Sequence, residues 1–270
     1  MRTVAPTDQF AEILSPSLWR RVKPWLFAIT ALILFLWMCT NVGLVPETFL
    51  AGMGRLGGFF SNMFPPSTGG NLERVLVSMA QTFAMAFAGT FIAALVALPL
   101  GMLGAKNIVS FPPLHFLIRR VFDMFRGIPA LIWALILVSA FGLGPFAGVV
   151  ALAVADTPVL AKLNAEAMEN INEKTRQGVR AAGGSSTHSL RFAVIPQVAP
   201  IIASHSLYYL ESNFRNAAVL GIVGAGGIGF ELEERIRIFA FDEVAFIILL
   251  YMMCVAILDS ISARIRARLA

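Results

Sequence analysis

The chain alternates long apolar runs with shorter polar segments, and the apolar runs are long enough to cross a lipid bilayer as helices. A transmembrane helix needs about 20 predominantly apolar residues. Six runs approach or exceed that length, at residues 25–42, 79–103, 121–141, 145–163, 194–220 and 244–261. The pattern therefore predicts an all-α, polytopic membrane protein with about six transmembrane helices.

The predicted spans contain glycine and proline, which membrane helices tolerate when neighbouring helices cover them. Gly89, Pro99 and Gly101 lie in the second span, and Gly127 and Pro129 interrupt the third. The fifth span is the least hydrophobic, and its polar residues are Ser204, His205, Ser206, Glu211, Asn213, Arg215 and Asn216. A helix this polar is expected to line a protein interior or a water-filled path.

Basic residues fall mainly on one side of the predicted spans. Fifteen of the 21 lysines and arginines lie near the termini or in the segments 104–120 and 162–193. The opposite loops hold four, which are Arg55, Arg74, Arg235 and Arg237. Because loops rich in Lys and Arg stay in the cytoplasm, both termini are predicted to be cytoplasmic. The net charge of +5 then reflects membrane topology and not nucleic-acid binding.

This topology divides the chain into four parts. They are a cytoplasmic N-terminal segment (1–24), a first span (25–42), an external loop (43–78) and a core of the remaining spans (79–265). The glycine- and proline-rich start of the external loop is either a contact for a partner protein or an unstructured loop. The core includes a long cytoplasmic loop at residues 164–196.

Composition narrows the class further. Hydrophobic residues make up 57% of the chain and charged residues 14%, against about 25% charged in soluble domains. These values exclude a disordered chain, a coiled coil and an ordinary water-soluble enzyme. Cys39 and Cys254 lie in apolar runs without metal-ligand spacing. No Walker A motif occurs, and Ser206, His205 and Glu211 lack the arrangement of a catalytic triad, so the chain is not expected to be an enzyme.

The cytoplasmic loop at 164–196 has a recognisable internal pattern. Residues 164–173 read as an amphipathic helix, and residues 177–196 as a short helix, a glycine break, a second short helix and a proline. Gly183 and Gly184 permit a turn with positive φ, and Ser185 or Ser186 caps the second helix. Such a loop either docks into a groove on another protein or rests on the membrane surface.

This loop resembles the EAA loop of ABC-importer permeases, which reads Glu-Ala-Ala, three residues, Gly, nine residues and Ile-x-Leu-Pro. Gly183 and Pro196 occupy the glycine and proline positions, and Gln177, Gly178 and Val179 replace Glu-Ala-Ala. In that family the loop inserts into a cleft of the ATPase subunit and transmits its closure to the membrane helices. The resemblance implies a role in ATPase coupling for Gln177, Gly178, Val179, Ala182, Gly183, Gly184 and Pro196.

A glycine tract follows the fifth span. Residues 224–229 match the G-x-G-x-x-G dinucleotide fingerprint, but that fingerprint requires a preceding strand within a βαβ unit, and here a membrane helix precedes it. The tract is therefore either a tight helix-ending loop or a close-packed gate. The hypothesis of a gate or translocation path names Glu211, Arg215, Asn216, Gly224, Gly226, Gly227 and Gly229.

Residues 215–229, with 98–101, 106–107 and 125–129, resemble phosphonate-importer permeases (PhnE). The resemblance covers roughly residues 75–265. It implies a MetI-like type I ABC importer permease in the bacterial inner membrane, acting as a homodimer by alternating access. It also implies two ATPase subunits (PhnC-like), which bind ATP and magnesium, and a substrate-binding protein (PhnD-like). No cofactor is expected in this chain.

The same resemblance gives phosphonate as the substrate, with phosphite or phosphate esters close behind. A methionine- or glycine-betaine-type permease is the alternative within the class. Outside the class, an ion channel would need a selectivity filter or a charged ring, and a membrane-embedded enzyme would need a convergent polar site. The sequence presents neither.

Charged residues inside the predicted spans need partners. Glu211 and Arg215 are spaced i,i+4, so they share a helix face and can pair. The alternatives are a structural pair, a contact of these residues to a neighbouring helix, or attraction of an anionic substrate by Arg215. Asp123 and Arg126 are predicted to form a local pair. Asp156 marks a kink or a polar lining. Among the histidines, His188 is expected at a surface or an interface, and His205 as a hydrogen-bonded core residue.

Overall fold

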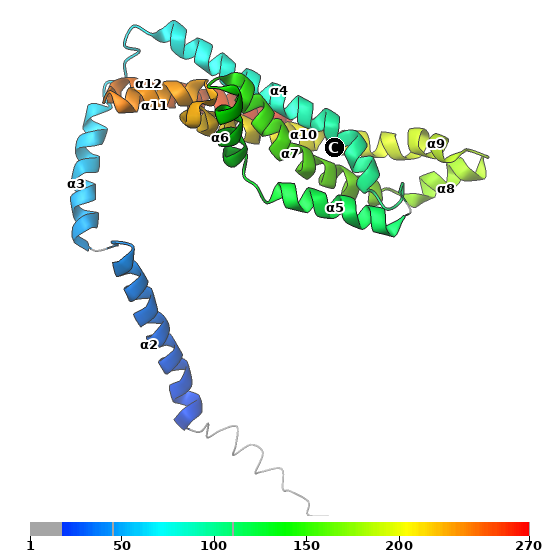
Figure 1. The fold of residues 1–270 in the computed structure, drawn as a ribbon, viewed down its shortest axis with the longest axis horizontal. Helices are drawn as coiled ribbons and strands as arrows, with labels where there is room; N and C mark the ends of the chain where they lie inside the picture. Colours follow the sequence, from blue (N-terminus) through cyan, green and yellow to red (C-terminus); the bar gives the residue numbers. More distant parts are fainter. Residues whose placement is uncertain (1–17, 45, 110, 270) are drawn as a thin grey trace, which may run out of the picture. The chain divides into compact units, whose positions relative to one another are not determined.

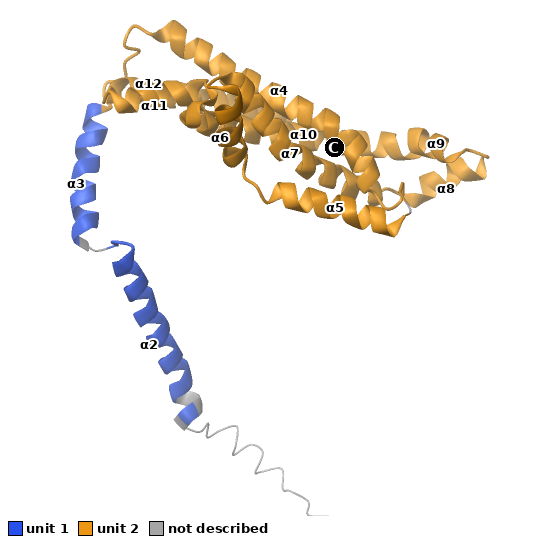
Figure 2. Ribbon diagram, in the orientation of Figure 1, with its two compact units in different colours: residues 1–62 blue, residues 63–270 orange. Residues whose placement is uncertain are grey.

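A computed structural model describes residues 18–44, 46–109 and 111–269, and in these residues all regular structure is helical (Figure 1). The chain divides into two compact units, residues 1–62 and 63–270 (Figure 2). Most of the predicted cytoplasmic segment 1–24 lies outside the described residues.

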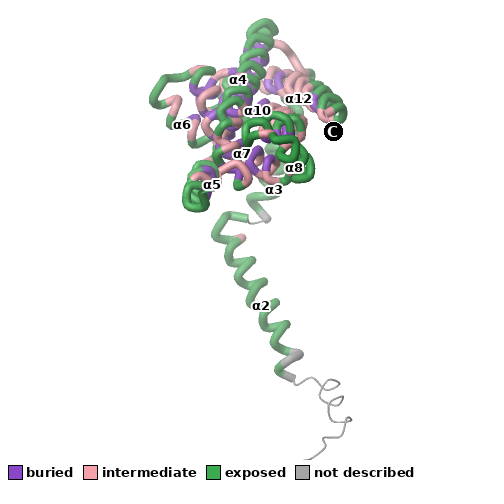
Figure 3. Tube along the Cα trace, turned by 90° about the vertical axis from the view of Figure 1, so that its right-hand side faces the viewer, coloured by how far each residue is buried: buried purple, intermediate pink, exposed green. Residues whose placement is uncertain are grey.

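The first unit contains the helices α2 (Leu18–Asn41) and α3 (Pro46–Asn62). The stretch Val22–Asn41 of α2 is long and apolar enough to cross a membrane, and none of it is buried within the chain (Figure 3). Of the glycine- and proline-rich stretch 43–71, residues 46–62 form α3, so the unstructured alternative is wrong for this part. Proline in the first turn and Glu47 beside it both favour a helix start.

The second unit contains the remaining elements. They are α4 (Leu72–Gly104), α5 (Pro112–Arg126), α6 (Ala130–Phe141), α7 (Pro145–Glu169), α8 (Glu173–Ala181), α9 (Ser186–Ser189), the π-helical turn η1 (Leu190–Val194), α10 (Ile195–Leu220), the π-helical turn η2 (Gly221–Ala225), α11 (Ile228–Arg237) and α12 (Phe241–Leu269). Helices α8 and α9 project from one end of this unit (Figure 1).

Helices α4 and α7 pack along each other and form the centre of the second unit, with α10 against both. Small residues make this contact close: a Cβ added at Gly101 would lie 2.9 Å from Asn164 Cβ, and one at Gly89 would lie 2.8 Å from Leu152 Cβ. Between membrane helices, association depends on such packing because lipid offers no hydrophobic driving force. The glycines of the second predicted span therefore serve helix contact.

Within the described residues, five helical segments are long and apolar enough to span a membrane, or six if the bent pair α5–α6 counts as one more. The third predicted span is not one continuous helix, because α5 and α6 meet at an angle of 78°. The break follows from Pro129, which has no N–H to donate and disfavours helical backbone in the residue before it. The predicted interruption at Gly127 and Pro129 is confirmed.

The fifth predicted span ends inside the bundle. Ile228, just after the glycine tract, donates its backbone N–H to Thr82 Oγ1 at 2.8 Å. Thr82 lies ten residues into α4, which is about 15 Å from the start of that helix. The glycine tract therefore lies inside the bundle, about 15 Å along α4 from its first residue. From there α11 runs back toward the first turn of α4.

Candidate functional site

The loop between α7 and α10 has the predicted order of short helix, glycine break and short helix. Gly183, with φ +80°, follows α8, its N–H donates to Arg180 O at 2.9 Å, and the N–H of Gly184 donates to Val179 O at 2.9 Å. This is a Schellman motif, which requires a residue with positive φ. A side chain at Gly184 would collide with Val179. The two glycines therefore fix the angle between α8 and α9.

Ser185 caps α9, as one of the two predicted alternatives stated. Its side chain accepts from His188 N at 3.3 Å, and His188 Nδ1 accepts from Ser185 N at 3.3 Å. This is a capping box in which histidine takes the place of the usual Glu or Gln. His188 is exposed and stacks on Phe192. Its expected surface position is confirmed, but its role in capping was missed.

The predicted amphipathic helix at residues 164–173 is wrong. Residues 164–169 are the last turns of α7, with Asn164 and Met168 each 1% exposed, and α8 begins only at Glu173. The apolar positions in this stretch face other membrane helices and not a membrane surface. Asn172 caps α8, and its own N–H donates to Gln197 Oε1 at 2.9 Å.

Glu169 holds the base of the loop between α7 and α10 (residues 170–194), here called the coupling loop after its predicted role. Its carboxylate accepts from Lys106 N at 2.8 Å and from Arg119 Nη2 at 2.9 Å, and His115 Nε2 lies 3.6 Å away. One side chain thus joins the end of α7 to α5 and to the turn after α4. The charged face of α5 is the sequence signal that could have pointed to such a partner.

The other predicted coupling residues lie at different positions, and most of them are on the outside of this loop. Gln177, Gly178 and Ala182 are exposed, and Val179 is partly buried against Gly184. Pro196 is the second residue of α10, where a proline fits a helix start.

The glycine tract closes tightly against the rest of the second unit. Gly224, Gly226 and Gly227 have φ values of +96°, +77° and +71°. Gly229 has an ordinary φ, but an added Cβ would overlap the carbonyl oxygen of Ala218. The segment is therefore a tight, close-packed loop that ends the fifth predicted span, and its role as a gate stays a prediction.

The tract contacts the start of α7 and, ten or more residues into the helix, α4. Gly144, next to the first residue of α7, donates its N–H to Gly224 O at 3.0 Å. A Cβ at Gly148 would lie 3.1 Å from Ala225 Cβ and 2.9 Å from Met85 Sδ on α4. The tract is thus packed between α4 and the first turn of α7.

An ion-pair network fixes α11 beyond the tract. Glu231 lies 2.7 Å from Arg74 Nε on α4 and 3.6 Å from Arg235 Nη2, and Arg235 Nε lies 2.7 Å from Glu243 Oε2 on α12. Glu231 and Arg235 are 3% and 6% exposed. Buried charges need such pairing. These ion pairs therefore join α4, α11 and α12 at this end of the unit.

Of the alternatives for Glu211 and Arg215, the structure shows contacts to a neighbouring helix and no pair between the two. Glu211 pairs with Arg266, and Arg215 Nη1 lies 3.3 Å from Asp259 Oδ1, so both residues of α10 reach across to α12. Arg215 and Asn216 are exposed in the single chain. A pocket of about 550 Å³ beside this pair is lined mostly by apolar residues, and its polar lining residues are Arg215, Tyr251 and Asp259.

Two other predictions about polar residues also fail. Asp123 pairs with Lys162 on α7 at 2.5 Å and with Arg120 at 3.5 Å, and not with Arg126. His205 is partly buried, and its Nδ1 has no hydrogen-bond partner in the described residues, so the expected hydrogen-bonded core histidine is wrong.

Asp156 belongs to a buried polar cluster in the centre of the bundle. Its carboxylate accepts from Asn213 Nδ2, and the same amide lies 2.9 Å from Thr90 Oγ1. The three residues come from α7, α10 and α4, and they are at most 8% exposed. The cluster joins the three central helices. This contact between helices is a role for Asp156 other than the two predicted alternatives, a kink and a polar lining.

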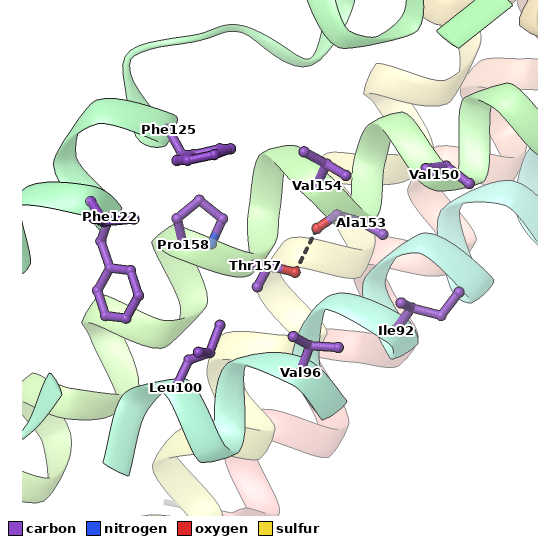
Figure 4. Close-up of a pocket in the computed structure, with 11 residues that line it drawn as sticks. Ile92, Val96, Leu100, Phe122, Phe125, Val150, Ala153, Val154, Thr157 and Pro158 are labelled. Atoms are coloured by element: carbon purple, nitrogen blue, oxygen red, sulfur yellow. Dashed lines mark hydrogen bonds between the residues drawn. The ribbon is translucent and has the colours of Figure 1, made fainter. Parts of the chain in front are cut away.

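A separate apolar pocket of about 470 Å³ lies between α4, α5 and α7 (Figure 4). Val96, Phe125 and Pro158 lie around it, and its one hydroxyl, from Thr157, donates to Ala153 O at 2.6 Å. Such a lining offers no free polar group to a charged solute. This pocket does not suit an anion.

Comparison with known proteins bears on this arrangement. Residues 97–270 match the family described as "Binding-protein-dependent transport system inner membrane component". The chain belongs to this family. It is a multi-pass permease of the inner membrane, and permeases of this family work with a substrate-binding protein and ATPase subunits.

Individual relatives cover most of the permease. It is 36% identical over 229 residues to the phosphite transport system permease PtxC of Stutzerimonas stutzeri, which covers 84% of this chain and 83% of that protein. It is 36% identical over 244 residues to the phosphate-import permease PhnE of Mycolicibacterium smegmatis, covering 90% of this chain. The permease spans 43% of the length of that mycobacterial relative.

A solved structure agrees with the fold. The permease superimposes on a chain of the MetNI methionine ABC transporter in an inward-facing conformation with a TM-score of 0.65 and 22% identity, covering 73% of this chain and 96% of that chain. The match supports the MetI-like fold of the permease.

Proposed function

We propose that this permease moves a phosphorus oxyanion into the cytoplasm, with phosphonate as the substrate and phosphite or phosphate as the near alternatives. The observation that carries the proposal is the similarity to relatives named for phosphite and phosphate transport, at 36% identity over 84% and 90% of the chain. Methionine permeases such as MetI of Haemophilus influenzae share only 26% identity over 57% of it.

The proposed mechanism is alternating access driven by partner ATPases. The exposed residues of α8 and the turn at Gly183 would dock into the ATPase subunits, and closure of these subunits would pull on the base of α7 and on α10. Both helices lead to the glycine tract, which we propose as the gate. ATP binding must stabilise the outward-open state more than the inward-open state for this coupling to work.

The proposed path runs along the face of α10 that carries Arg215 and Asn216. A half-exposed ion pair such as Arg215 and Asp259 is costly against lipid. A second permease copy and a water-filled path between the two copies would remove that cost, which supports a homodimer. Arg215 then offers an anionic substrate a positive charge that Asp259 only partly compensates.

The partners proposed are two ATPase subunits of the phosphonate-importer type and a binding protein of the same system. Helix α3 is the proposed contact for the binding protein, because the charge distribution places it outside the cytoplasm.

Reconstituted uptake tests the substrate class. The assembled transporter in proteoliposomes, with its binding protein outside and ATP inside, should take up methylphosphonate, phosphite or phosphate in an ATP-dependent manner. Methionine serves as the comparison substrate. Uptake of methionine without uptake of any phosphorus oxyanion would overturn the proposal.

A further inference from the structure

A polar pocket of about 290 Å³ lies beneath the coupling loop, on the side that the charge distribution assigns to the cytoplasm. It is formed by one face of α8, by α9 and η1, and by the turn after α4. Its polar lining consists of Asn107, Arg176, Arg180, Ser186, Thr187 and Ser189. The pocket thus combines two guanidinium groups with three hydroxyl groups.

Two of the lining residues have polar atoms that lack partners. Ser189 is 3% exposed, and its Oγ has no hydrogen-bond partner in the described residues. Asn107 Oδ1 is likewise buried without a donor, whereas Nδ2 of the same side chain donates to Met168 O at 2.5 Å. Buried polar atoms are costly when unpaired. Both residues line a pocket large enough for a small ligand.

The charges of the pocket are not fully compensated. Arg176 and Arg180 are one turn apart on α8, so they share a face, and like charges at this spacing repel. Glu173 Oε1 lies 3.0 Å from Arg176 Nε and neutralises part of this charge. Arg180 forms no ion pair with a carboxylate in the described part of the chain. The pocket therefore has an excess of positive charge.

We propose that this pocket binds a phosphate-type oxyanion, which Arg180, Arg176 and the hydroxyl of Ser189 hold. Guanidinium and hydroxyl donors are the groups that bind such anions in proteins. The oxyanion is either a free ion in the cytoplasm or the headgroup phosphate of an anionic lipid. The permease's proposed transport of phosphorus oxyanions suggests a free ion, and only this choice of source rests on the proposed function.

Asn107 is expected to let the pocket distinguish phosphate from sulfate. A lone acceptor such as Oδ1 favours a ligand that carries a proton to donate. At neutral pH phosphate still carries an O–H group and sulfate carries none. The pocket is therefore expected to prefer phosphate over sulfate, although both are tetrahedral dianions of similar size.

An ion in this pocket would join α8 and η1 to the turn after α4. The coupling loop would then be braced against the membrane helices by the ion as well as by Glu169. Accumulated phosphorus oxyanion in the cytoplasm would in this way stiffen the loop that receives the ATPase signal, and it would change the rate of the transporter from the product side.

Equilibrium binding of inorganic phosphate tests the site. The assembled transporter, nucleotide-free and in phosphatidylcholine nanodiscs, is titrated with radiolabelled phosphate, and hydrogen exchange is followed in residues 173–194. Wild type should bind phosphate and exchange more slowly in this segment. Arg180→Gln should raise Kd about tenfold, as expected for the loss of one charge-assisted contact, and Ser189→Ala should raise it severalfold.

Arg191→Gln is the matched control, because Arg191 is exposed on the same loop and lies over the Phe192 ring outside the pocket. It should leave Kd within about twofold of wild type. Equal affinity of wild type and Arg180→Gln, or sulfate binding as tightly as phosphate, would overturn the proposal.

Nanodiscs with phosphatidylglycerol distinguish the sources. If phosphate binds more weakly in these nanodiscs than in phosphatidylcholine nanodiscs, and Arg180→Gln removes this difference between the two lipids, the lipid headgroup is the occupant. An unchanged affinity would identify the free ion. Failed uptake of phosphorus compounds with intact phosphate binding would remove the proposed function and leave the pocket assigned.

Discussion

Arg215 Nη1 lies 3.3 Å from Asp259 Oδ1, across the contact between α10 and α12. A second pair, Glu211 with Arg266, crosses the same contact. The charges of the polar fifth span therefore attach it to α12. If α10 moves during transport, α12 moves with it or these pairs break.

Charge removal should show this attachment. Arg215→Gln and Asp259→Asn should each lower uptake and the yield of assembled complex, because each leaves a half-exposed charge without its partner. The double variant should lose less than the sum, with a coupling free energy of about 1 kcal/mol in thermal unfolding of the purified complex. Additive losses would mean that the pair contributes nothing, and normal uptake by both Arg215→Lys and Arg215→Gln would exclude a role of Arg215 in attracting substrate.

Gly183 offers a test of docking that separates charge from backbone strain. Asn and Asp both tolerate positive φ better than other residues, and no atom lies within 4 Å of a Cβ at this position. Gly183→Asn should therefore keep ATPase stimulation by the binding protein near wild type, and Gly183→Asp should abolish it by placing a charge in the docking turn. Equal activity of the two variants would contradict this.

Asp156 should matter through its hydrogen bond. Asp156→Asn can still accept from Asn213 and should unfold near the wild-type temperature, whereas Asp156→Ala leaves the buried amide short of a partner and should cost about 1–3 kcal/mol. Thermal unfolding in detergent measures both. Equal stability of the Asn and Ala variants would show that the cluster of Thr90, Asn213 and Asp156 adds little.

Gly229 should resist any side chain. Gly229→Ala forces a methyl group into the space of Ala218 O, and overpacking of this kind costs about 3 kcal/mol. The variant should lose stability and transport together. Gly57→Ala in α3 is the control, since a Cβ there meets nothing within 4 Å, and it should leave stability unchanged. A fully stable Gly229→Ala variant would show that the tract is loosely packed.

Local signals in the sequence predicted local structure well. The glycine turn at Gly183 and the break at Pro129 each depend on neighbouring residues, so the sequence alone predicts them, and it narrows the cap to Ser185 or Ser186. The gate residues and the coupling residues remain predictions about function, although the structure places them in two distinct, well-defined elements.

Contacts between distant segments could not be predicted in this way. The i,i+4 rule paired Glu211 with Arg215 because it considers one helix only, whereas their partners lie 55 and 44 residues further along the chain. The same limit applies to Asp123, whose partner is on α7, and to residues 164–173, whose apolar positions turned out to face neighbouring helices. Burial by tertiary packing decides these cases.

The length of helix α7 and the contacts at its two ends allow it to transmit motion. It is one helix of 25 residues from Pro145 to Glu169, about 37 Å long. Its first turn is packed against the glycine tract and its last residue holds the base of the coupling loop. It can therefore act as a lever: a tilt of about 5° about one end displaces the other by about 3 Å. If the glycine tract is the gate, as proposed, ATPase closure and gate opening need no relay of side chains between them, because one helix contacts both the tract and the base of the coupling loop.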